Sequence, residues 1–147
     1  MALISPEYLE QQQKLHERPD YGAGYADVHK YITPIIERMV NQWQVPHLLD
    51  YGCGKGALFR NINPDHKMRL QAYDPAIPEC SEAPAPAPMV ACLDVLEHVE
   101  PEHLEDVLDD LERVTERVGV FSVHTGPAAK TLADGRNAHL IQMPPRS

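Results

Sequence analysis

The chain has 147 residues, of which 43% are hydrophobic and 24% are charged, and its formal net charge is −9. These values predict one globular domain with its own core. The acidic balance argues against a broad surface for nucleic acid or anionic membranes, without excluding a local pocket for an RNA end. No apolar run has membrane-spanning length, and the first ten residues lack the basic start and apolar centre of a signal peptide. Three cysteines without a metal-binding spacing predict a reduced, cytoplasmic protein.

The first predicted elements in chain order are two helices. Ser5 and Pro6 are typical of an N-cap and a first helical position, so we expect a polar helix over 5–17. After a loop, the apolar spacing predicts a second helix over 28–43 that is interrupted near Pro34. The apolar residues that share its inward face are Ile32, Ile35, Ile36 and Met39.

From residue 47 onward, short apolar strands alternate with helices. The strands are expected at 47–52, 69–74, 89–96 and 118–125, and the helices at 56–62 and 101–117. The last helix carries an apolar stripe formed by Leu104, Val107, Leu108, Leu111 and Val114. The last two strands are nearly all apolar, as expected of strands that are covered on both faces. This alternation predicts an α/β fold with a parallel sheet and helices on both faces.

Two segments depart from this alternation. The proline-rich stretch 75–88 cannot form a regular helix, so we expect it to cross the sheet as an extended strap. The tail, 126–147, is predicted to be partly helical at best, with a turn at Asp134–Gly135.

A glycine-rich stretch, LLDYGCGKGALF (48–59), joins the first strand to the following helix. In open parallel sheets, ligands bind beyond the carboxyl ends of the strands, and glycine there permits a close approach of the ligand. Gly52, Gly54 and Gly56 also match the loose dinucleotide fingerprint, so the glycines alone do not identify the ligand. Asp50 argues against a dinucleotide, because its carboxylate would repel a pyrophosphate and suits a ligand with a cationic amino group.

Further polar residues are expected at the same edge of the sheet. Asp74 ends the second strand, where it is positioned to accept hydrogen bonds from ribose hydroxyls. Asp94, Glu97 and His98 follow the third strand within the stretch CLDVLEHVEPEHLEDVL. Because parallel strands end at one edge, these side chains should lie near the glycine loop.

Three stretches together resemble the class I S-adenosylmethionine-dependent methyltransferases. LLDYGCGKG, LQAYDPA and MVACLDVLEHV are similar to the first, second and fourth motifs of that family, and they occur in the same order. The resemblance covers about residues 45–125. It implies a Rossmann-like open parallel sheet and S-adenosyl-L-methionine as the cofactor.

The resemblance also implies a role for individual residues. The three glycines would line the methionine part of the cofactor, and Asp50 would reach its amino group. Asp74 would hold the ribose, and Pro75 and Ala76 would border the adenine. The segment YGAGY is placed like a cofactor lid, which adds two tyrosines. The full set of predicted cofactor residues is Asp50, Tyr51, Gly52, Cys53, Gly54, Gly56, Asp74, Pro75, Ala76, Asp94, Tyr21 and Tyr25.

The chain is abbreviated relative to that family. We expect one methyltransferase-like domain with N-terminal helices and lid (1–44), a cofactor-binding core (45–125) and a substrate-side tail (126–147). Only four or five strands fit, and the family's terminal antiparallel hairpin is missing. A homodimer or a partner chain is therefore expected to cover the last strand, unless the segment AHLIQM folds back over it.

Methyl transfer is an in-line displacement in which the protein aligns the acceptor and helps to remove its proton. His98 and His124, with Glu97 to orient an imidazole, are the predicted catalytic residues; His139, in the tail, has the same chemistry. The pair Glu97-His98 also resembles a feature of some metal-dependent O-methyltransferases, with Asp94 and His124 as further ligands. The same string is common in relatives without a metal, so no metal is predicted.

The predicted function is methyl transfer from S-adenosylmethionine to a hydroxyl or amine of a small molecule. A second hypothesis is a module that binds S-adenosylmethionine without turnover and acts with a partner chain. A third is a nicotinamide-binding fragment, against which Asp50 and the fourth motif argue.

Overall fold

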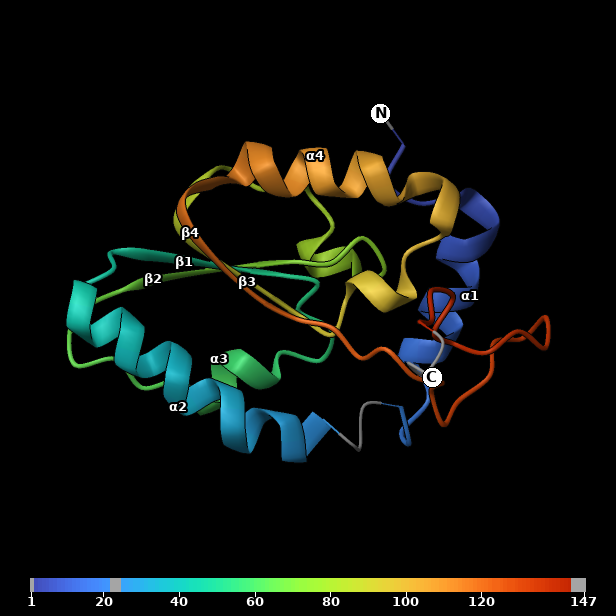
Figure 1. Cartoon of the computed structure of the whole chain (residues 1–147), viewed down its shortest axis with the longest axis horizontal. Coiled ribbons are helices and arrows are strands. Elements are labelled where there is room, and N and C mark those ends of the chain that lie inside the picture. Colours follow the sequence, from blue (N-terminus) through green and yellow to red (C-terminus); the bar gives the residue numbers. More distant parts are fainter. Residues whose placement is uncertain (1, 22–24, 144–147) are drawn as a thin grey trace.

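The computed structural model describes residues 2–21 and 25–143, with the side chains of 25–29 not included. It forms three layers, with a parallel sheet between helices (Figure 1). In the described part of the chain the sheet has four strands in the order β2-β1-β3-β4, all parallel. The strands are β1 (His47–Tyr51), β2 (Arg69–Tyr73), β3 (Ala87–Leu93) and β4 (Thr115–Ser122). The α/β class and the open parallel sheet are confirmed, and the arrangement is consistent with a Rossmann-like sheet.

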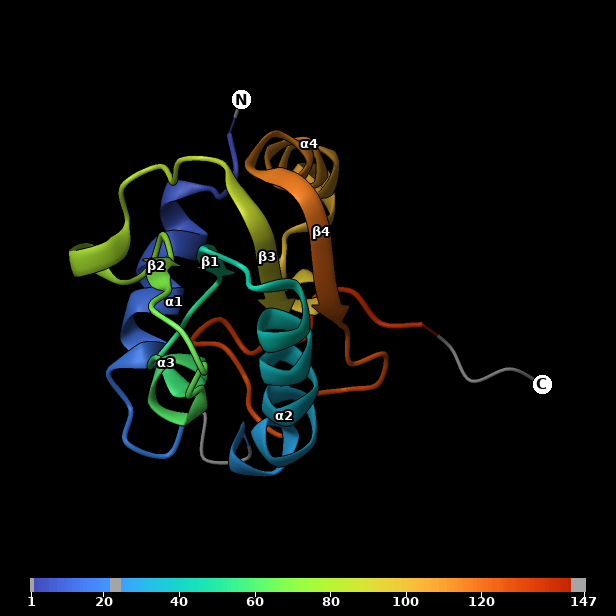
Figure 2. The ribbon, with the colours of Figure 1, turned by 90° about the vertical axis from the view of Figure 1, so that its left-hand side faces the viewer.

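The helices cover both faces of the sheet. They are α1 (Pro6–His16), α2 (Tyr25–Trp43), α3 (Ala57–Asn61) and α4 (Leu104–Val114), and short 3₁₀ turns lie at Pro78–Cys80, Leu96–His98 and Pro101–His103. Figure 2 shows α4 on one face of the sheet and α2 on the other, while α1 lies near the carboxyl ends of the strands (Figure 1). Among the helices whose residues are described, none is both long enough and apolar enough to cross a membrane.

Two apolar cores hold these layers together. On one face, Ile36 and Val40 of α2 pack with Leu48 and Met89 of the central strands. On the other face, α4 packs against a second set that consists of Leu49, Tyr51, Val90 and Cys92. Since both faces of β1 and β3 are covered, nearly all of their residues are buried, which explains their continuous apolar sequences.

Helix α2 differs from its prediction, because it continues through Pro34 without interruption. Pro34 is exposed, so the backbone hydrogen bond that proline removes is missing from the solvent side. The buried contacts of Ile36 and Val40 hold the helix together on the opposite side. Ile35 was expected on the inward face, but it is 54% exposed.

The boundary between α4 and β4 also differs from its prediction. The helix was expected to reach residue 117, but it ends at Val114, and β4 begins directly at Thr115. The Thr115 hydroxyl donates a hydrogen bond to the Leu111 carbonyl at 2.7 Å, which satisfies one of the last free carbonyls of the helix. Leu108 was assigned to the buried stripe, but it is 44% exposed.

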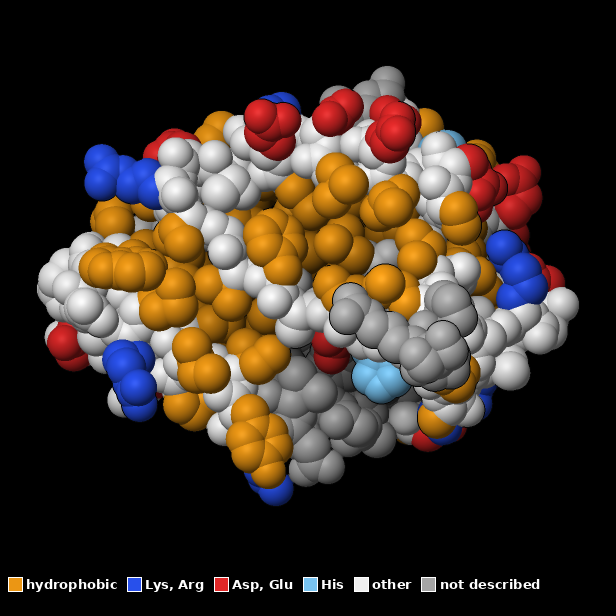
Figure 3. All heavy atoms as spheres, in the orientation of Figure 1, with side chains coloured by type: hydrophobic (Ala, Val, Ile, Leu, Met, Phe, Trp, Pro, Cys, Tyr) orange, Lys and Arg blue, Asp and Glu red, His pale blue; other side chains and the backbone are white. Residues whose placement is uncertain are grey.

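The prediction that β4 is buried was wrong. It is the edge strand of the sheet, and none of its residues is fully buried. Phe121 on β4 and Val123 just after it are 49% and 48% exposed. Figure 3 shows hydrophobic side chains gathered between α4 and α2, over the part of the molecule where β4 runs.

The proline-rich stretch and the tail agree with their predictions in part. The stretch 75–88 lacks an α-helix, as expected, but it includes the 3₁₀ turn Pro78–Cys80, and its last two residues already belong to β3. The turn at Asp134–Gly135 is confirmed, with Gly135 at φ 90° and an antiparallel bridge between Thr131 and Asn137.

The tail packs on α1 instead of on the sheet. Leu132 and Ala138 of the tail form a small apolar cluster with Tyr8 and Leu15 of α1. As far as residue 143, the tail adds no strand to β4. The segment AHLIQM therefore does not cover the edge of β4; it helps to close the carboxyl-terminal end of the sheet.

Candidate functional site

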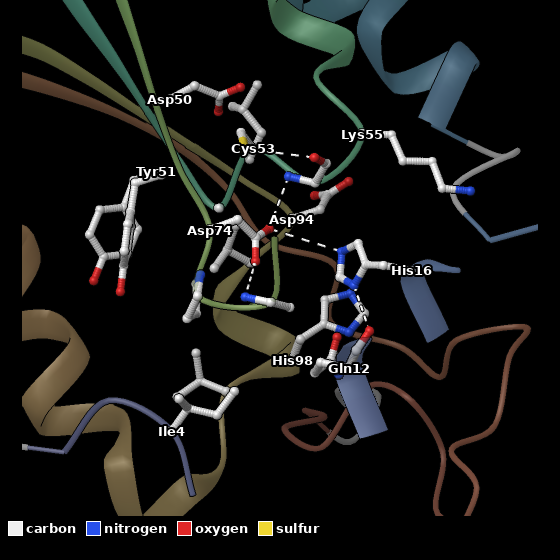
Figure 4. A pocket seen from close by; sticks show the side chains of 18 of the residues that line it. Ile4, Gln12, His16, Asp50, Tyr51, Cys53, Lys55, Asp74, Asp94 and His98 are labelled. Carbon is white, nitrogen blue, oxygen red and sulfur yellow. Dashed lines mark hydrogen bonds and ion pairs between the residues drawn. The ribbon is translucent and has the colours of Figure 1, made fainter. Parts of the chain in front are cut away.

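A cavity of about 200 Å³ lies at the carboxyl ends of β1, β2 and β3. The chain passes from β1 to β2 on one side and then crosses to β3 on the other side of β1, so the cavity lies at the switch point where ligands of open parallel sheets bind. Its walls are the glycine loop after β1, the end of β2, the turn after β3 and helix α1 (Figure 4). The lining includes ten of the predicted cofactor residues, namely Tyr21, Asp50, Tyr51, Gly52, Cys53, Gly54, Asp74, Pro75, Ala76 and Asp94.

The glycine loop requires glycine at its predicted positions. Gly52, Gly54 and Gly56 have φ angles of 82°, 49° and 76°, a region that other residues rarely adopt. A Cβ atom on Gly52 would also lie 2.3 Å from Cγ2 of Val95. The backbone amide of Gly52 donates a hydrogen bond to the Tyr73 carbonyl at 2.7 Å, which fixes the loop to the end of β2.

Asp74 joins two loops of the cavity. Its Oδ2 accepts a hydrogen bond from the Gly54 amide and its Oδ1 accepts one from the Ala76 amide, both at 2.9 Å. Nε2 of His16 lies 4.0 Å from Oδ2 (Figure 4). A carboxylate offers about four lone-pair sites, so this buried side chain can still accept hydrogen bonds from a ligand.

Asp50 is the least satisfied acid of the cavity. It is 4% exposed, and the part of the chain that the structure describes gives its carboxylate no hydrogen-bond partner. Burial, together with the nearby Asp74 carboxylate, raises the pKa of Asp50 to about 7. A cationic ligand beside Asp50 would restore its ionised form.

Helix α1 supplies a wall of the cavity that the sequence did not predict. Tyr8, Gln12 and His16 all line it, and none of them is among the residues predicted for the site. The Gln12 amide donates to the Tyr8 hydroxyl at 2.7 Å, and His16 Nδ1 donates to the Gln12 carbonyl at 2.7 Å. Tyr21 packs edge-on against His16 at 5.1 Å. The spacing of four residues on one helix face was the signal that would have identified this wall.

The three predicted catalytic residues lie close together, but only one of them lines the cavity. His98 lines the cavity, whereas Glu97 and His124 do not. His98 Nδ1 donates to the Ala138 carbonyl at 2.9 Å, and burial together with the neighbouring His139 lowers the pKa of His98 to about 4. Glu97 is 1% exposed, and burial raises its pKa to about 7. His124 is exposed on the surface.

Several predicted cofactor residues have structural partners of their own. The Tyr51 hydroxyl donates to Asp110 at 2.7 Å in the core, so only part of this side chain faces the cavity. Cys53 Sγ lies 3.4 Å from Cys80 Sγ. Gly56 does not line the cavity, and the side chain of Tyr25 lies outside the described residues.

Asp94 has an unusual backbone for an aspartate, with φ 53°. Its amide donates to the Ser122 carbonyl at 2.9 Å, and the Ser122 hydroxyl donates to Asp94 Oδ1 at 2.9 Å. These bonds fix the turn after β3 against the end of β4. The turn therefore presents Asp94 and His98 to the cavity from one rigid segment.

Comparison with protein-family models finds no model that matches the chain, and comparisons with curated proteins and with solved structures find no match either.

Proposed function

We propose that the chain binds S-adenosyl-L-methionine in this cavity and transfers its methyl group to a hydroxyl or amine of a small molecule. The observation that carries the proposal is the buried Asp50 carboxylate beside the glycine loop, which has no hydrogen-bond partner among the described residues. A buried charge without a partner is costly, and an ammonium group is the partner that best offsets this cost. The amino acid part of S-adenosylmethionine carries such a group.

The nucleoside half suits the other side of the cavity. Asp74 has lone pairs left for ribose hydroxyls, and Pro75 and Ala76 offer apolar contacts for a base. Among the described residues, the cavity is lined by four acids, Asp50, Asp74, Asp94 and Glu100, against the two cations Lys55 and Arg60, and this excess of negative charge would repel a pyrophosphate group. This charge pattern argues against a nicotinamide dinucleotide as the ligand.

The transfer itself requires little from the protein. The cofactor supplies an activated methyl group, so the chain has to align the acceptor and exclude water. His98 lines the cavity, and its Nδ1 donates to a carbonyl, which leaves Nε2 with a lone pair for the acceptor's proton. Because its pKa is lowered to about 4, His98 is a weak base and is better suited to orient the acceptor than to take its proton.

The second candidate is a module that binds S-adenosylmethionine without turnover and acts with a partner chain. The exposed apolar side chains on and around the edge strand β4 favour it, because a partner surface would cover them.

Calorimetric titration with S-adenosylhomocysteine and with NAD tests the ligand assignment. We expect S-adenosylhomocysteine to bind and NAD not to bind. Asp74→Ala should weaken binding by about 1–3 kcal/mol through lost hydrogen bonds. His47→Gln is the matched control, because His47 lies at the opposite end of β1 and should leave the affinity unchanged. Binding of NAD but not of S-adenosylhomocysteine would overturn the proposal.

Turnover separates the enzyme from the module. If the chain methylates a member of a panel of hydroxyl and amine compounds, the enzyme hypothesis stands. Tight binding of S-adenosylmethionine without turnover on the whole panel, alone and with a captured partner chain, would favour the module.

A further inference from the structure

We propose that Glu97, His98 and His139 form a binding site for a divalent transition-metal ion such as Zn²⁺. One potential ligand atom from each of these side chains lies within 4.8 Å of the other two. Glu97 and His98 belong to the 3₁₀ turn after β3, and His139 belongs to the tail. The proposal does not rest on the proposed function, since the three side chains meet whether or not the cavity holds a cofactor.

Glu97 offers an oxygen that has no partner. The side chain is 1% exposed, and its Oε1 accepts a hydrogen bond from the His124 amide at 3.2 Å. Its Oε2 is buried and makes no hydrogen bond. Leaving one oxygen of a buried carboxylate unpaired is costly, and a bound cation is one way to offset this cost. A metal ion would satisfy this oxygen.

Both imidazoles are prepared for metal binding. His98 Nδ1 donates to the Ala138 carbonyl at 2.9 Å, and His139 Nδ1 donates to the Gly126 carbonyl at 2.8 Å. Because a carbonyl can only accept, each ring carries its proton on Nδ1 and keeps the lone pair of Nε2. This is how metal-binding histidines are usually held, with the other ring nitrogen bonded to a backbone carbonyl.

The fold holds the tail histidine in place. The amide of Ile141 donates to the Glu97 carbonyl at 3.1 Å, which ties the tail to the turn. The rings of His98 and His139 lie edge to face with centroids 4.7 Å apart. The cluster differs from the ligand set suggested by sequence, because Asp94 and His124 do not belong to it and His139 does. The packing of the tail on α1 and the bond between Ile141 and Glu97 together bring His139 to this position.

The ligand types indicate the class of ion. Two imidazoles with one carboxylate suit Zn²⁺ and related transition metals, whereas Mg²⁺ and Ca²⁺ prefer oxygen ligands. Three protein ligands also leave zinc an open coordination position, as in catalytic zinc sites. His98 lines the cavity as well, so the ion would lie at the cavity wall and would occupy the Nε2 lone pair that His98 otherwise offers to the acceptor.

Zinc titration of the full chain, after removal of metals with a chelator, tests this site. Wild type should bind one equivalent of Zn²⁺. It should bind Mg²⁺ with much lower affinity. Glu97→Gln keeps an acceptor for the His124 amide and removes the charge, and His139→Ala removes one imidazole. Each change should weaken zinc binding by at least about tenfold. His47→Gln is the control, because it removes a half-buried histidine that is not part of the cluster, and it should bind zinc like wild type.

The affinity for S-adenosylhomocysteine, measured on the same samples, distinguishes a failure of the zinc site from a failure of the proposed cofactor cavity. Neither Glu97 nor His139 lines the cavity, so a folded variant should lose zinc and retain this ligand if wild type binds it. Wild type that binds no zinc would overturn the metal site. Zinc binding that both variants retain would also overturn it, because the ion would then be held by other histidines.

Discussion

The buried Asp50 carboxylate should make the protein less stable as the pH rises. Its pKa is about 7 in the folded chain, against 3.8 for an aspartate in water. Between these two values the unfolded chain has released its proton while the folded chain retains it. The unfolded state therefore binds fewer protons, and the free energy of unfolding falls with increasing pH. The loss ends above about pH 7, where both states are ionised.

The expected size follows from these two pKa values. Integrating the proton uptake from pH 5 to pH 8 gives a loss of about 2–3 kcal/mol from Asp50 alone. For a chain of this length, this corresponds to about 5–10 °C in melting temperature. Glu97 titrates in the same direction, since burial raises its pKa to about 7. Its contribution is the same in wild type and in an Asp50 variant, so it cancels in their comparison.

Urea denaturation of wild type and Asp50→Asn at pH 5 and pH 8, without ligand, measures this contribution. The stability lost between the two pH values should be smaller in Asp50→Asn by about 2–3 kcal/mol. Asp134→Asn replaces an exposed acid and should change the loss by less than about 0.5 kcal/mol. An equal loss in wild type and Asp50→Asn would mean that the Asp50 carboxylate is not desolvated, and the case for a cationic ligand would fail with it.

Three further predictions follow from the cavity and the sheet. Calorimetry should show that S-adenosylhomocysteine binds wild type about eightfold more tightly at pH 7.5 than at pH 6, because the ammonium group of the ligand requires ionised Asp50. Asp50→Asn should remove this pH dependence. Gly52→Ala should lower the free energy of unfolding by at least about 2 kcal/mol through backbone strain and overlap with Val95. Gly135→Ala, with a positive φ but open space around it, should cost less, and equal losses would contradict the overlap. Light scattering should show a homodimer that Phe121→Glu dissociates; a wild-type monomer with slow hydrogen exchange along β4 would contradict this.

Much of the cavity was predictable from the sequence because its residues are fixed by local rules. The glycines at 52 and 54 have positive φ angles that few other residues adopt, so their spacing reports the shape of the loop. Asp50 and Asp74 follow from strand order, since parallel strands end at one edge. The continuous apolar character of β3 correctly predicted burial on both faces.

The remaining features depend on contacts between segments that are distant in sequence. His139 enters the metal cluster because the tail packs on α1, and the local sequence gives no sign of that packing. The strand β4 has the apolar composition of a central strand, but composition does not reveal that β4 lies at the edge of the sheet, with a strand on one side only among the described residues. Thr115 to Arg117 were assigned to the preceding helix because apolar periodicity does not mark where an edge strand begins.

The buried acids of this chain differ in how far the protein itself satisfies their carboxylates. Asp110 accepts hydrogen bonds from Tyr51 and Arg113, at 2.7 and 2.9 Å, and Glu100 accepts two from Ser5. These acids connect the core and α1 and need nothing further.

Asp50 and Glu97 are equally buried, yet one has no hydrogen-bond partner among the described residues and the other has an unpaired oxygen. Burial raises the pKa of both to about 7. Two such acids at one end of a sheet would weaken the fold above neutral pH, unless cations compensate them. An ammonium group at Asp50 and a metal ion at Glu97 would each neutralise one of these buried carboxylates. If both bind, the chain should gain stability from each ligand, and any departure from additivity should arise at His98, the cavity-lining residue that belongs to the metal cluster.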